Sequence, residues 1–212
     1  MSPRFPFAAR LGTLCLSAAL LAGGLSACAP LVVGGAVGTG VLVATDRRTS
    51  GAQLEDQSIE LKAASRLRDQ FGDRARVVVT SFNRRVLLTG EVPSETDKAA
   101  AERVVAGVEN VKVIVNELGT MSSPSLTARS ADALVTARVK AAMIDASDLQ
   151  ANTVKVLTER GTSYLMGLVT QREADRATEI TRSIPGVQRV VRVFEVISDA
   201  ELQRIQAASG KK

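Results

Sequence analysis

The stretch Val86-Leu87-Leu88-Thr89-Gly90-Glu91-Val92-Pro93-Ser94-Glu95-Thr96-Asp97 decides the fold, because a strand, a glycine and the start of a helix follow one another within it. Its apolar, β-rich beginning ends at Gly90, a residue type that suits special backbone geometry or the close approach of another segment. Ser94 can cap a helix, and Asp97 follows three residues later. The stretch therefore predicts a strand followed by a helix over about 94–107.

The segments on either side complete one αββαβ unit. Arg76–Phe82 is a second β-rich run, and the Asn83-Arg84 pair that separates it from Arg85–Gly90 predicts a hairpin. Val111–Leu118 predicts a third strand. Upstream, apolar residues at helical spacing predict a helix over about 55–71 that ends near Gly72: Ile59, Ala63, Leu67 and Phe71. Such a unit places two helices on one face of a three-stranded mixed sheet, which is an α+β fold.

The same unit occurs a second time, so the chain carries an internal repeat of about 65 residues per copy. An apolar stripe predicts the first helix of this copy: Ala131, Val135, Val139 and Ala142. The other predicted elements are strands over Val154–Glu159 and Ser163–Val169 around the turn Arg160-Gly161, a helix over about 171–183, a strand over Val187–Ile197 and a tail helix over Asp199–Ala208. Gly167 corresponds to Gly90, and Ile184–Val187 corresponds to Val108–Val111.

The repeated pattern resembles the BON domain family. Three pieces carry the resemblance: Ala44-Thr-Asp-Arg-Arg-Thr-Ser-Gly51, Val86-Leu-Leu-Thr-Gly-Glu91 and Gly167-Leu-Val-Thr-Gln-Arg-Glu-Ala174. Two copies over about residues 28–197 are similar to the dual-BON outer-membrane lipoproteins. That resemblance implies binding of anionic phospholipid through the second BON domain and a role in outer-membrane integrity. The chain departs from the family pattern at Val108-Glu-Asn-Val111, where Pro-Gly-Val is usual, so we expect a less tight turn there.

The N-terminus has the three parts of a secretory signal: Arg4 and Arg10, an apolar run over 11–25, and small residues before a cleavage point. Leu25-Ser-Ala-Cys28 resembles the lipobox of bacterial lipoproteins, which implies that Cys28 is acylated and becomes the first residue. By resemblance to lipoprotein sorting signals, Ala29 after it favours the periplasmic face of the outer membrane. An ordinary signal peptide with a nearby cysteine is the alternative.

A glycine-rich apolar tract over 31–44 is too short to span a membrane, which takes about 20 apolar residues, and we interpret it as a flexible tether. The predicted organisation is a signal peptide over 1–27, a lipidated tether over 28–53, BON domain 1 over 54–119, a linker over 120–128, BON domain 2 over 129–197 and a tail over 198–212.

Composition excludes several classes of function. Removal of residues 1–27 takes away two arginines and no acid, so Lys+Arg falls from 27 to 25 against 22 Asp+Glu, and this mild charge argues against nucleic acid as a partner. The chain has no histidine, which removes the commonest general base and most transition-metal sites. Glu173 with Asp175, and Glu95 with Asp97, lie in first turns of helices, where acids complement the helix dipole. We therefore expect no enzyme, no cofactor and no metal.

Three glycines are predicted to serve the backbone: Gly90, Gly167 and Gly186. The first helix of the second copy holds the candidate lipid-binding residues. Leu134 and Ala141 lie off the core stripe of this helix, Arg138 flanks the stripe, and Arg129 is expected just before the helix begins. An exposed leucine beside cations suits a lipid headgroup surface. Leu134 could equally pack against the other BON domain or be an ordinary surface leucine.

Two functions remain in competition. The first is a lipid-anchored binding module that contacts an anionic phospholipid membrane. The second is a scaffold whose BON domains bind envelope proteins, with the lipid serving only as an anchor.

Overall fold

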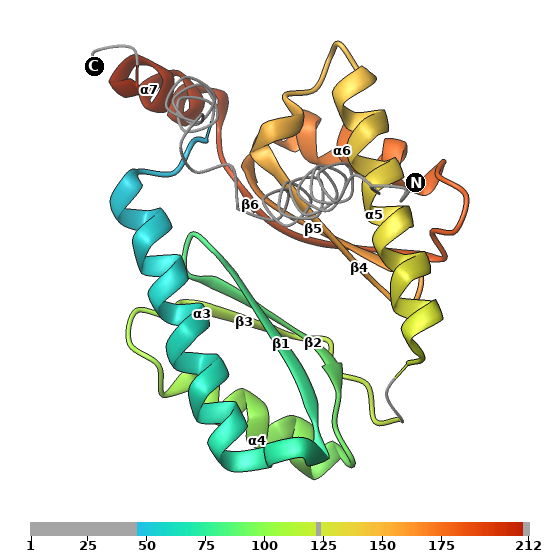
Figure 1. The fold of residues 1–212 in the computed structure, drawn as a ribbon. Coiled ribbons are helices and arrows are strands. Elements are labelled where there is room, and N and C mark those ends of the chain that lie inside the picture. The colour runs from blue at the N-terminus through green and yellow to red at the C-terminus, as the bar shows by residue number, and fades with distance from the viewer. Residues whose placement is uncertain (1–45, 122–123, 210–212) are drawn as a thin grey trace, which may run out of the picture. The chain divides into compact units, whose positions relative to one another are not determined.

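The computed structural model describes residues 46–121 and 124–209. The expected signal peptide, Cys28 and the glycine-rich tract lie outside these residues. The described chain forms two αββαβ units and a tail helix (Figure 1). The first unit consists of α3 (Ser50–Phe71), β1 (Arg76–Phe82), β2 (Arg85–Glu91), α4 (Glu95–Ala106) and β3 (Val113–Asn116). The second consists of α5 (Leu126–Asp145), β4 (Val154–Glu159), β5 (Thr162–Val169), α6 (Gln171–Arg182) and β6 (Arg189–Val196), and α7 (Asp199–Ser209) follows it.

Each unit has one three-stranded mixed sheet. In the first, β1 pairs antiparallel with β2, and β2 pairs parallel with β3. In the second, β5 likewise pairs antiparallel with β4 and parallel with β6. Figure 1 shows α3 and α4 on one face of the first sheet, and α5 and α6 on one face of the second. The predicted α+β class and the αββαβ order are confirmed.

Local sequence explains the turns of both hairpins. Asn83 and Arg84 have φ of 51° and 65°, and Arg160 and Gly161 have φ of 51° and 69°. Positive φ at both central residues is the geometry of a type I′ turn, which matches the twist of the flanking strands.

A buried aspartate on the first helix of each unit holds the hairpin turn. Asp56 accepts hydrogen bonds from the backbone N–H groups of Asn83 and Arg84, both at 2.7 Å. Asp132 accepts them from Arg160 at 2.7 Å and Gly161 at 2.9 Å. These bonds offset the cost of burying a carboxylate.

The buried stripe of α5 therefore differs from the predicted one. It consists of Asp132, Val135, Val139 and Met143, whereas Ala131 is exposed and Ala142 is half-buried. The prediction that Ala131 belongs to the stripe is wrong, because hydrogen bonds to the hairpin turn draw its polar neighbour Asp132 inward.

Alternation along the central strands creates two kinds of apolar face. Val86 and Leu88 pack with the helices of the first unit, and Leu165 and Val169 pack with those of the second. Side chains at alternate positions point to the opposite face of each sheet, which no helix of its own unit covers. One apolar cluster joins these two faces: Phe82, Leu87, Tyr164, Met166, Leu168 and Val193. The two units thus share a third apolar core.

The three predicted backbone glycines occupy positions where a side chain would collide with a neighbour. Gly90 has φ of 112°, and a Cβ there would overlap the carbonyl oxygen of Arg76. A Cβ on Gly167 would overlap the carbonyl oxygen of Thr153. Gly186 has φ of 100°, and a Cβ there would lie 2.7 Å from Cγ2 of Val135. In the first unit Asn110 takes the place of Gly186 with φ of 66°, so both helix-to-strand turns use left-handed backbone.

We expect Gly167→Val to lower the free energy of unfolding by about 3 kcal/mol, because a branched side chain would collide with the backbone carbonyl of Thr153, just before β4. Thermal unfolding followed by circular dichroism measures the loss. Gly51→Val is the control, since a Cβ there meets nothing closer than 3.9 Å. An unchanged melting temperature for Gly167→Val would contradict the account of this glycine.

The first helix starts earlier than predicted. It begins at Ser50 instead of about residue 55, because the hydroxyl of Thr49 caps it by accepting from the N–H of Ala52 at 3.1 Å. The two residues before the cap are held by ion pairs, Arg47 with Glu173 at 2.7 Å and Arg48 with Asp56 at 2.8 Å. The part of the expected tether over 46–53 therefore belongs to the fold.

The Arg47–Glu173 pair makes stability depend on pH. Hydrogen bonding by Arg47, aided by the backbone of Thr170, lowers the pKa of Glu173 to about 2 from its ordinary 4.5. A depressed pKa stabilises the fold fully above pH 4.5, and this contribution is lost as the pH falls toward 2. In urea unfolding between pH 2 and pH 6, we expect Glu173→Gln to be less stable than wild type at pH 6, with a difference that shrinks as the pH falls. Glu201→Gln, a change of a half-buried glutamate on the tail helix, should give the same pH dependence as wild type. A difference that does not change with pH would contradict this account.

Candidate membrane-contact surface

Helix α5 is apolar on two opposite faces. The side chain of Ser125 caps it by accepting from the N–H of Ala128 at 3.1 Å. Its 20 residues extend about 30 Å at 1.5 Å per residue. One face is fixed against the sheet through Val135, Val139 and Met143. A surface helix needs only one such face for packing, so the second face is available for contact.

The structure places the four predicted lipid-binding residues on the exposed part of α5. Leu134 is 52% exposed, and Arg129, Arg138 and Ala141 are exposed as well. At about 100° per residue, Leu134, Arg138 and Ala141 share one side of the helix, whereas Arg129 lies about 140° from Leu134. The structure thus brings three of the four together.

Two exposed residues at the ends of the helix extend this surface. Leu126 is 73% exposed and Ile144 is 69% exposed. On the helical wheel, Leu126, Ala137 and Ile144 fall with Leu134 and Ala141 inside an arc of about 80°. We call these five residues the α5 apolar face. Sequence reasoning missed Leu126, Ala137 and Ile144, although their spacing of 11 and 7 residues is a helical signal.

Cations flank the α5 apolar face on both sides. Arg138 lies about 40° from Leu134 on one side, and Lys140 and Arg129 lie about 120° and 140° away on the other. Within residues 46–121 and 124–209, none of these three side chains forms an ion pair. An apolar strip with unpaired cations on its flanks matches the layering of a membrane surface, where acyl chains lie beneath phosphate groups.

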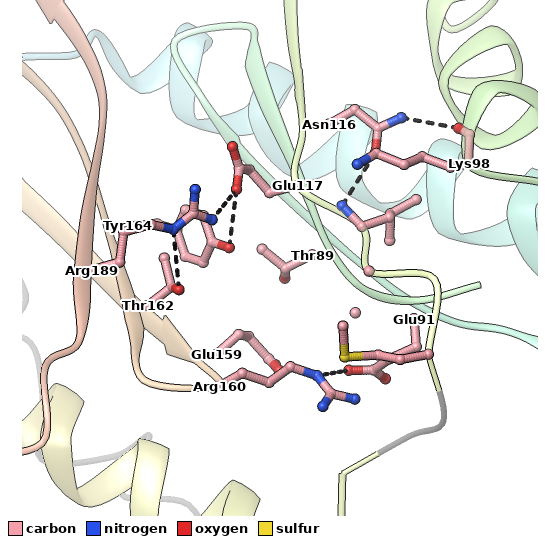
Figure 2. Close-up of a pocket in the computed structure, with 14 residues that line it drawn as sticks. Thr89, Glu91, Lys98, Asn116, Glu117, Glu159, Arg160, Thr162, Tyr164 and Arg189 are labelled. Carbon is pink, nitrogen blue, oxygen red and sulfur yellow. Dashed lines mark hydrogen bonds and ion pairs between the residues drawn. The ribbon is translucent and has the colours of Figure 1, made fainter. Parts of the chain in front are cut away.

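A hollow of about 500 Å³ lies beside the shared apolar core (Figure 2). Ion pairs join several acidic and basic side chains in and around it. The buried carboxylate of Glu91 binds Arg76 at 2.9 Å and Arg160 at 3.0 Å, and Arg76 also binds Glu159 at 2.7 Å. Burial raises the pKa of Glu91, but the hydrogen bonds from Arg76 and Arg160 outweigh this effect and bring the pKa below its usual value.

The other side of this hollow carries the single tyrosine. Burial, together with the charge of Glu117, raises the pKa of Tyr164 to about 12. Figure 2 shows Glu117 directed toward both Tyr164 and Arg189, with Glu117 and Arg189 forming an ion pair. The raised pKa keeps this phenol protonated at neutral pH. Among the described residues, no group of three or more acidic, cysteine or histidine side chains could hold a metal ion.

Comparison with known proteins identifies the repeats. The BON domain family matches residues 55–119 and 131–198. The chain is 37% identical to outer membrane lipoprotein DolP of Haemophilus influenzae over 175 residues, which cover 82% of this chain and 90% of that protein. It is 32% identical to the 21 kDa hemolysin of Actinobacillus pleuropneumoniae, over 72% of this chain and 79% of that protein.

A third relative is the osmotically-inducible protein Y of Escherichia coli, which is 27% identical over 66% of this chain and 72% of its own length. No helix in the described ranges 46–121 and 124–209 is long and apolar enough to cross a membrane. The matched ranges coincide with the two αββαβ units, so the chain belongs to the BON domain family and carries two BON domains in tandem.

Proposed function

We propose that this protein is a non-enzymatic lipoprotein of the outer membrane, anchored at its periplasmic face through Cys28, that binds anionic phospholipid with helix α5 and supports the integrity of the envelope. The observation that carries the proposal is the α5 apolar face, with flanking cations that form no ion pair among the described residues. The membrane location is supported by the lipobox-like Leu25-Ser-Ala-Cys28 and by 37% identity to an outer membrane lipoprotein.

The expected binding energy suits a helix that lies in the interface. Leu126, Leu134 and Ile144 keep more than half of their surface exposed, and shallow burial of this area would contribute on the order of 3 kcal/mol. Each cation near an anionic surface adds about 1 kcal/mol. The helix alone would therefore bind reversibly, and the acyl anchor would keep it at the membrane.

The test uses the unlipidated chain 29–212 and vesicle flotation. We expect this chain to float with vesicles that contain phosphatidylglycerol, to float poorly with pure phosphatidylcholine, and to lose binding at high salt. Equal recovery with both vesicle types, or none with either, would contradict phospholipid binding through α5. A scaffold for envelope proteins would then be the better account of the BON domains.

A further inference from the structure

The chain that enters the first BON domain is held by the second BON domain through Arg47. Its side chain is only 6% exposed and donates to both carboxylate oxygens of Glu173, each at 2.7 Å. It also donates to the carbonyl oxygen of Leu168 at 2.9 Å and to Oε1 of Gln150 at 3.0 Å. All four contacts lie in the second domain.

The next residue, Arg48, binds the first domain. It donates to Asp56 at 2.8 Å and to Asp46 at 2.7 Å. Its guanidinium carbon lies 3.9 Å from the ring centroid of Phe82, a residue of the core shared by the two sheets. Two adjacent arginines therefore contact opposite domains.

The second repeat shows that a BON domain forms without this arginine. Thr49 and Ser125 cap the corresponding helices α3 and α5. The residue before Ser125 is Pro124, where the first repeat has Arg48. Asp132 nevertheless holds its hairpin turn as Asp56 does. The arginine pair therefore serves the connection between the domains.

The geometry of the Arg47–Glu173 pair suits a lock. Burial of two charges is costly unless they meet in good geometry with further hydrogen bonds. Here a two-pronged guanidinium–carboxylate pair is 6% and 5% exposed and is completed by a backbone carbonyl and an amide. Such a pair makes its two-pronged contact in one arrangement of the domains, and other arrangements give up these hydrogen bonds.

We propose that Arg47 and Arg48 are positioning residues that lock the α5-bearing domain to the chain leading from the lipid anchor, an inference that rests on the proposed function. Gln150, which Arg47 contacts, lies five residues beyond the end of α5 at Asp145. The anchor chain therefore joins the fold beside that end of the helix. The 18 steps from Cys28 to Asp46 span at most about 60 Å, so the anchor keeps α5 at a high effective concentration near the bilayer.

The first arm of the test measures, without a membrane, whether the two domains keep one arrangement. The chain 29–212 contains no cysteine, so spin labels at Ser65→Cys on α3 and Ala137→Cys on α5 report one distance between the domains. We expect a narrow distance distribution in wild type and a broad one in Arg47→Gln/Arg48→Gln. Arg204→Gln, which removes an exposed arginine of the tail helix, should match wild type.

Circular dichroism and Arg47→Lys complete this arm. The lysine keeps the charge but loses the two-pronged geometry, so we expect intermediate broadening with unchanged helix content. A narrow, wild-type distribution in the double glutamine variant would overturn the inference.

The second arm uses the full lipidated chain in vesicles with a low phosphatidylglycerol content. Because Cys28 is acylated, an environment-sensitive dye on Ala137→Cys is at the only free thiol and reports insertion of α5. We expect at least a threefold smaller inserted fraction in the lipidated double variant. The unlipidated double variant should bind phosphatidylglycerol-rich vesicles as well as the unlipidated wild type. Equal insertion of both lipidated proteins would overturn the positioning role. Failure of the unlipidated wild type to bind any vesicle would instead overturn the proposed function, with the spin-label result unaffected.

Discussion

Cys28→Ser is expected to abolish lipidation and to release the protein from the membrane fraction. A serine hydroxyl cannot form the thioether that carries diacylglycerol, and the acyl chains supply about 0.8 kcal/mol for each buried methylene. The free energy of membrane binding that is lost with the acyl chains far exceeds what α5 can supply. Incorporation of labelled palmitate, followed by fractionation of cells, measures the outcome.

The matched control for this variant is Cys15→Ser. Cys15 lies within the apolar run of the expected signal peptide and would be removed with it, so this change should leave labelling and fractionation intact. A Cys28→Ser protein that still incorporates palmitate would show that the lipobox interpretation is wrong.

Leu134→Glu is expected to reduce binding of the unlipidated chain to anionic vesicles by at least tenfold. The change removes apolar burial worth about 1.5–3 kcal/mol at full depth and adds a charge that anionic headgroups repel. Arg138→Glu should have a smaller effect, since each basic charge contributes about 1 kcal/mol. Both residues are exposed and lie outside the buried stripe of α5, so folding should survive. Vesicle flotation with circular dichroism measures both properties.

Leu61→Glu provides the matched control for this effect. Leu61 is 74% exposed on α3, the equivalent helix of the first BON domain, and its replacement should leave flotation unchanged. Equal losses for Leu61→Glu and Leu134→Glu would mean that the effect is general repulsion and does not depend on α5.

Local patterns were sufficient to predict most of the fold. The hairpins at Asn83-Arg84 and Arg160-Gly161 were predictable because turn residues separate β-rich runs, and the helices because their apolar residues recur at a period near 3.6. The buried aspartates were not predictable in the same way. Asp56 and Asp132 are polar residues on an apolar stripe, and only their hydrogen bonds to distant turns explain why they are buried.

Contacts across long stretches of chain account for the rest. Arg47 and Glu173 are 126 residues apart, and no local pattern connects them. The shared core also depends on which face of each sheet the other domain covers, and alternation along Val86, Leu87 and Leu88 does not determine this. On α5, the exposed Leu134 was predictable from its angle to Val135. Leu126 and Ile144 were not predicted, because the core stripe alone does not show how far the opposite face extends along the helix.

The depth of α5 in a bilayer tests directly whether this helix is the membrane-contact surface. Single spin labels at Leu134→Cys, Ala141→Cys and, as a reference on the first domain, Leu61→Cys can be compared in the lipidated protein on phosphatidylglycerol-containing vesicles. Relaxation by oxygen, which is enriched in lipid, and by a water-soluble nickel complex reports the depth of each label. We predict that the labels at 134 and 141 lie below the phosphate level and that the label at 61 remains in water. Labels at 134 and 141 that stay as accessible to nickel as the label at 61 would contradict the account.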